Sequence, residues 1–87
     1  MGLDTVELIL FAEEHFGVSV PGERAEKTIT VEQFALLLWE LQANVLSALT
    51  YNQVLLELQQ LVALNFKIPI ELVVPTARFV QDLGLDQ

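Results

Sequence analysis

The chain has 87 residues, of which 53% are hydrophobic, and its 12 acidic and 4 basic residues give a formal net charge of −8. This length suits one small domain, and the charge argues against a nucleic-acid partner because an acidic surface repels the phosphate backbone. There is no cysteine, which excludes disulfides and thiol catalysis. The chain also lacks a run of about 18 apolar residues that could span a membrane and the basic start of a signal peptide. We therefore expect a single cytoplasmic domain over 1–87 that binds neither nucleic acid nor membrane.

The first predicted helix runs from Leu3 to Phe16 and ends at Gly17, a residue type that often follows the last turn of a helix. Asp4 and Glu7 have the spacing of a capping box at its start. At about 100° per residue, the face expected in the core carries Thr5, Leu8, Ile9, Ala12 and Phe16. The opposite face carries Glu7, Glu13 and Glu14 together with two aliphatic residues, Val6 and Leu10.

A connector over 18–28 follows, in which Pro21-Gly22 interrupts regular structure and 23–27 can form one short helical turn. Thr30 and Gln33 then have the spacing of a capping box, which predicts a second long helix. Its buried stripe consists of Phe34, Leu37, Leu38 and Leu41.

Thr50 and Gln53 repeat the capping-box pattern, and a third long helix is expected to follow and to end before Pro69. Its apolar residues are Val54, Leu55, Leu58, Leu61, Val62 and Phe66. Residues 68–86 are predicted to form a long loop, anchored by Ile70, Leu72, Val74, Phe79, Val80 and Leu83. The predicted core joins the three helices through Leu8, Ile9, Ala12, Phe16, Phe34, Leu37, Leu38, Leu58, Leu61 and Val62.

The junction between the second and third helices leaves two alternatives. No Gly or Pro occurs between Gly22 and Pro69, so 31–66 could form one continuous helix about 54 Å long. Because a compact domain of this size has a radius of gyration of only about 12 Å, such a helix would require two chains to exchange halves. The capping box at Thr50 favours a turn within 44–50, and hence a monomer rather than a half-exchanged dimer.

Two short motifs stand at opposite ends of the chain. Residues 79–86 read Phe-Val-Gln-Asp-Leu-Gly-Leu-Asp, and residues 3–8 read Leu-Asp-Thr-Val-Glu-Leu. Placed tail to head, they resemble the signature of the acyl carrier protein family. The resemblance covers nearly the whole chain with the halves exchanged: 1–44 resembles the C-terminal half of the family, 45–49 is a junction, and 50–87 resembles the N-terminal half. It implies an all-α, acyl-carrier-protein-like bundle of three main helices plus one short helix, circularly permuted.

The resemblance also implies a function based on a serine that carries 4′-phosphopantetheine. That serine would lie between Asp86 and Leu3, but the residues there, Gln87 and Gly2, have no hydroxyl. Ser19 and Ser47 lie outside the motif. We therefore expect no cofactor on this chain.

The acidic helix is the second feature that the resemblance makes functional. In the family it docks on basic surfaces of carrier-dependent biosynthetic enzymes, such as synthases, reductases and the transferase that attaches the cofactor. The matching partner-binding positions are Asp4, Val6, Glu7, Leu10, Glu13 and Glu14. Aliphatic residues framed by carboxylates suit electrostatic steering onto a small dry contact. The alternative is that the acids only solvate the helix and that the two aliphatic residues are ordinary surface residues.

Nothing in the sequence predicts an enzyme. His15 is the single histidine, which is a poor start for a metal site, and Glu13 and Glu14 point about 100° apart on a helix. We expect an acyl-carrier-like domain of the fatty-acid or polyketide biosynthesis type that keeps the docking helix and lacks the serine. The alternative is an engineered circular permutant or an interaction module with no carrier activity. The leading Met-Gly and the position of the break within the motif favour an engineered origin.

Overall fold

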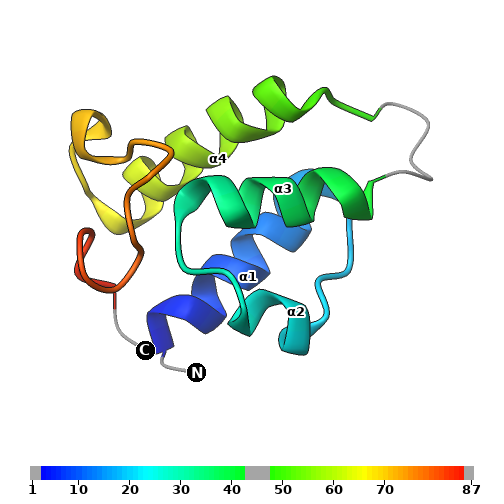
Figure 1. Ribbon diagram of the computed structural model, residues 1–87, viewed down its shortest axis with the longest axis horizontal. Coiled ribbons are helices and arrows are strands. Elements are labelled where there is room, and N and C mark those ends of the chain that lie inside the picture. The colour runs from blue at the N-terminus through cyan, green and yellow to red at the C-terminus, as the bar shows by residue number, and fades with distance from the viewer. Residues whose placement is uncertain (1–2, 43–47, 86–87) are drawn as a thin grey trace.

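The computed structural model describes residues 3–42 and 48–85. These residues form α1 (Leu3–Phe16), α2 (Gly22–Glu26), α3 (Val31–Leu41), α4 (Tyr51–Phe66) and the short 3-10 helix η1 (Ile70–Leu72). Figure 1 shows α4 lying over α3, while α1 crosses behind α3 and the C-terminal segment runs down one side of the molecule. The predicted all-α class with three main helices and one short helix is confirmed, and the radius of gyration is 11.8 Å.

Local sequence signals set the helix ends. Thr30 accepts a hydrogen bond from the amide of Gln33 (3.3 Å) and Gln33 Oε1 accepts one from the amide of Thr30 (3.2 Å). Thr50 and Gln53 form the same pair at the start of α4, at 3.2 and 2.9 Å. Both predicted capping boxes are therefore confirmed.

The predictions for the two ends of α1 had different outcomes. Gly17 follows the helix with φ +66°, and its amide donates to the carbonyl oxygen of Glu13 at 2.9 Å, as expected for a glycine stop. The capping box predicted at Asp4 and Glu7 is wrong, because α1 already begins at Leu3 and Asp4 lies inside its first turn. A carboxylate there still suits the positive end of the helix.

The core agrees closely with the hydrophobic pattern. Every predicted core residue is buried except Ile9, which is half-buried and packs against the others. Several residues outside the predicted core set are buried as well: Val20, Ala25, Val31, Ala35, Val54, Val73, Ala77 and Leu85. Two edge-on ring pairs, Phe11 with Phe66 and Phe34 with Phe79, each have centroids 6.0 Å apart and extend the core to the C-terminal third of the chain.

The C-terminal segment packs differently from the prediction. Phe79 is buried and Val80 and Leu83 are half-buried, but Ile70, Leu72 and Val74 are 47%, 56% and 44% exposed. The reason is that Val73 and Ala77, which follow the tight turn of η1, occupy the inward positions.

Backbone hydrogen bonds hold this segment against the start of α3. The amide of Val31 donates to the carbonyl oxygen of Ala77 (3.0 Å), and that of Glu32 donates to Pro75 (2.8 Å). The first amides of a helix have no partner within the helix, so the segment supplies the missing acceptors. This pairing fixes which residues of the segment face inward.

Helices α3 and α4 are separate and do not form one continuous helix. Helix α3 ends at Leu41, residues 48–50 are not helical, and α4 begins at Tyr51. The buried side chain of Gln42 donates to the carbonyl oxygen of Leu49 at 2.8 Å and so holds the two sides of the junction together. The rest of the predicted junction, 43–47, lies outside the described residues.

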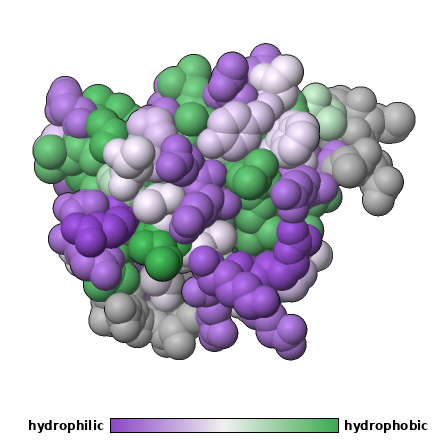
Figure 2. Space-filling view, in the orientation of Figure 1, coloured by the Kyte–Doolittle hydropathy of each residue, from purple (hydrophilic) through white to green (hydrophobic). Residues whose placement is uncertain are grey.

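Apolar side chains also remain on the surface. Figure 2 shows several apolar patches, separated by hydrophilic side chains, on one face of the molecule. No helix in the described ranges combines the length and the apolar character needed to cross a bilayer.

Candidate functional site

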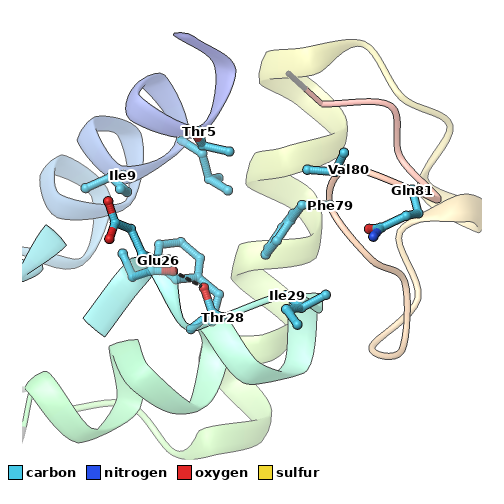
Figure 3. A pocket seen from close by; sticks show the side chains of 11 residues that line it. Thr5, Ile9, Glu26, Thr28, Ile29, Phe79, Val80 and Gln81 are labelled. Carbon is cyan, nitrogen blue, oxygen red and sulfur yellow. Dashed lines mark hydrogen bonds between the residues drawn. The ribbon is translucent and has the colours of Figure 1, made fainter. Parts of the chain in front are cut away.

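A cavity of about 450 Å³, partly open to solvent, lies between the start of α1, the α2–α3 connection and the C-terminal segment (Figure 3). Its walls are mostly apolar. They are formed by Thr5, Leu8, Ile9, Ala25, Glu26, Thr28, Ile29, Phe34, Phe79, Val80 and Gln81. The arrangement can take up an aliphatic chain, because burying apolar surface is favourable and needs no specific polar partner.

The packing of two buried rings forms one wall of this cavity. Phe34 comes from α3 and Phe79 from the C-terminal segment, and their rings meet at an interplanar angle of 85°. The amide of Phe79 donates to the carbonyl oxygen of Ile29 at 2.9 Å, which ties the segment to the connection before α3. The wall is thus fixed by both side-chain and backbone contacts.

The cavity joins the two motifs from opposite ends of the chain. Thr5 and Leu8 belong to the first motif, and Phe79, Val80 and Gln81 belong to the second. Residues of the two motifs, which stand at opposite ends of the chain, therefore line the same cavity. Most of the other wall residues were not predicted, because they come from a connector with no strong pattern of its own.

The Asp-Leu-Gly stretch of the second motif closes a turn. Asp82 Oδ2 accepts a hydrogen bond from the Arg78 amide (2.8 Å), and Asp82 Oδ1 accepts one from Arg78 Nη2 (3.1 Å). The side-chain hydrogen bond from Arg78, aided by the one from its backbone, lowers the pKa of the Asp82 carboxyl below its usual value. Gly84 has φ +70°, and Leu85 after it is buried. In this chain these residues position Phe79 and Val80 at the cavity.

The residues of the predicted docking face of α1 differ in how far they are exposed. Val6 and Leu10 are 40% and 57% exposed, and Glu14 beside them is exposed. Glu13 instead turns toward the chain after α1, where its Oε2 accepts a hydrogen bond from the amide of Val20 at 2.7 Å. Asp4 and Glu7 are half-buried. The partner-binding role of these residues stays a prediction.

His15 has a structural partner that the sequence did not indicate. Its Nε2 lies 2.8 Å from Glu57 Oε1, which connects α1 to α4. The two residues are 42 positions apart, so no local pattern could have paired them. Among the residues that the structure describes, no group of three or more His, Asp or Glu side chains could hold a metal ion.

Comparison with known proteins gives a partial match. Over 39 residues, which are 45% of this chain, it is 51% identical to "Acyl carrier protein, chloroplastic" from Brassica napus. The chain is therefore distantly related to an acyl carrier protein over part of its length. The match covers 29% of that protein, so the chain spans less than a third of its length. No protein-family model matches the chain, and no solved structure does.

The name of this relative bears on the expected compartment. It places the Brassica napus protein in the chloroplast. The cytoplasmic location expected for this chain stays a prediction.

Proposed function

We propose that this chain is an acyl-carrier-like domain with its two halves in exchanged order, one that docks on carrier-dependent biosynthetic enzymes and carries no phosphopantetheine. The observation that supports it best is the cavity, because residues of both motifs line it. The short extent of the sequence match is also in keeping with exchanged halves. An alignment that preserves chain order can include only one half of a permuted protein, and the match covers 45% of the chain.

The size of the cavity supports an acyl group as its occupant. An engineered apolar cavity of about 150 Å³ holds benzene, and the present cavity is about 450 Å³. Each buried methylene contributes about 0.8 kcal/mol, so a chain of several carbons would bind measurably. In this proposal the domain shelters an acyl group rather than transforming it, and it is not an enzyme.

The absence of a hydroxyl at the attachment point allows a test of one part of the proposal, that the chain carries no phosphopantetheine. Transfer of phosphopantetheine requires a hydroxyl nucleophile, and neither Gly2 nor Gln87 has one. Incubation with coenzyme A and a phosphopantetheinyl transferase should leave the intact mass unchanged. A mass increase of one phosphopantetheine unit on the unaltered sequence would refute the proposal, and Gln87→Ser and Gly2→Ser variants show whether the hydroxyl is all that is missing.

Docking is proposed to use the exposed centre of α1. Val6 and Leu10 supply apolar contact, and Glu14 with the other acids of α1 supplies steering. Exposed ion pairs are worth only about 0–1 kcal/mol each, and the screening length falls to about 3 Å at 1 M salt. Binding should therefore be weak and sensitive to salt.

A titration with matched variants tests this surface. A labelled basic transferase is titrated with the chain at low and high salt, and Leu10→Ala and Glu14→Lys should each weaken binding. Leu64→Ala and Glu71→Lys are the controls, because these residues are exposed on α4 and η1, outside the docking face. Binding that ignores salt and both α1 substitutions would reduce this face to a solvated surface.

The alternative function is an interaction or structural module with no carrier activity, natural or engineered. The missing hydroxyl favours it. An unchanged mass together with no binding to any carrier-dependent enzyme would select this alternative.

A further inference from the structure

One charged side chain lies in the wall of the cavity. Glu26, an exposed residue at the end of α2, is the single ionisable residue among the described residues that line it. Figure 3 shows its carboxylate beside Ile9, on the side of the cavity formed by α1 and α2. A ligand whose head group lies on this side of the cavity is in the field of this carboxylate.

The charge of Glu26 is not neutralised by a direct partner. Within 3–42 and 48–85, its carboxylate takes part in no hydrogen bond or salt bridge. Arg24 pairs with Glu40 at 2.6 Å, and Arg78 is engaged by Asp82. Lys27 follows Glu26 in the chain but does not line the cavity. The net charge of −8 adds to the negative potential around the opening.

This charge acts on a ligand according to its head group. A fatty acid is ionised at pH 7, because an unperturbed carboxyl has a pKa of about 4. Two like unit charges about 4 Å apart in water disfavour association by about fivefold. A neutral ester, thioester or alcohol escapes this penalty, because it carries no charge for the carboxylate to repel.

We infer that the cavity binds aliphatic chains with an uncharged head group and discriminates against free fatty acids, with Glu26 as the residue that sets this preference. The inference rests on the proposed function, since it takes an acyl chain as the occupant. It adds that the acyl group is accepted as a neutral ester or thioester and that the ionised free acid is disfavoured.

Three probes with the same eight-carbon chain test the inference: octanol, octanoate and octylammonium. Each is titrated into the isotope-labelled full chain at pH 7 and low salt, and binding is followed by amide chemical shifts around the cavity. Octanol should bind about fivefold or more tightly than octanoate, and octylammonium should bind at least as tightly as octanol. In 1 M salt the difference should shrink.

The decisive variant is Glu26→Gln, which should remove most of the difference in affinity between octanol and octanoate. Glu71→Gln is the matched control, because Glu71 is an exposed acid that does not line the cavity, and it should preserve the preference. Octanoate binding as tightly as octanol to the unaltered chain would overturn the inference and leave the acyl cavity standing. If octanol itself fails to bind, the acyl occupant of the proposed function fails together with the inference.

Discussion

Helix α3 packs in two different ways on its two sides. Helices α3 and α4, which pack together, carry six side chains with no exposed surface: Val31, Ala35, Leu38, Val54, Leu58 and Val62. Toward α1 and the C-terminal segment, the buried rings of Phe34 and Phe79 border an open cavity instead. One side is a dense contact between two regular, capped helices, whereas the other is built from short segments. We therefore expect substitutions on the dense side to lower stability more than substitutions on the cavity side.

The largest expected effect comes from shortening a buried side chain of α4 on the dense side. Leu58→Ala removes a fully buried side chain and should lower the free energy of unfolding by about 3–5 kcal/mol. Leu8→Ala, which enlarges a cavity that already exists, should cost less, at about 2 kcal/mol. Urea unfolding followed by circular dichroism measures both. A cost for Leu8→Ala equal to or above that for Leu58→Ala would break the comparison.

A smaller effect is expected at the start of α4. Thr50→Ala removes the side-chain oxygen that accepts from the amide of Gln53, so stability should fall by about 1 kcal/mol. Thr76→Ala is the control, because Thr76 is exposed and caps no helix, and it should have almost no effect. Thermal unfolding of the two variants beside the unaltered chain decides the matter, and equal midpoints for both would contradict it.

The smallest effect is expected from the exposed pair at the C-terminal turn. The pKa of Asp82 is lower in the folded chain than in the unfolded chain. Its stabilisation is therefore complete above the unfolded pKa of about 3.9 and is lost as the pH falls through the folded value. The difference in urea midpoint between the unaltered chain and Asp82→Asn should be present at pH 7 and should vanish in strong acid. A difference that grows on acidification would contradict the predicted pH dependence of the stabilisation by Asp82.

Local features of the fold were predictable from the sequence because their causes are local. The capping boxes at Thr30 and Thr50 and the glycine stop at Gly17 each depend on residues within one turn of a helix. The buried stripes follow from the helical period in the same way. The error at Asp4 belongs to this class, since one more residue at the start of α1 moves a cap into the first turn.

Features that depend on distant contacts were not predictable in this way. Val73 and Ala77, rather than Ile70 and Leu72, face inward because the carbonyl oxygen of Ala77 accepts from the start of α3. The cavity arises only when three separate segments meet. The hydrogen bond that Glu13 accepts from the amide of Val20, seven residues later, likewise depends on the path of the chain after α1. The resemblance identified the two motifs, but only the fold placed them on one cavity.

The hydrogen bond from Gln42 to Leu49 has a practical consequence for attaching the protein to other molecules. Because this contact already holds α4 next to the end of α3, residues added between the two positions would only have to form a loop. Doubling the length of a flexible loop costs about 0.6 kcal/mol. The end of α3 and the start of α4 also lie at the far end of the molecule from the C-terminal segment (Figure 1). A fluorescent label or a surface tether inserted there would report on, or immobilise, the domain while the cavity stays accessible.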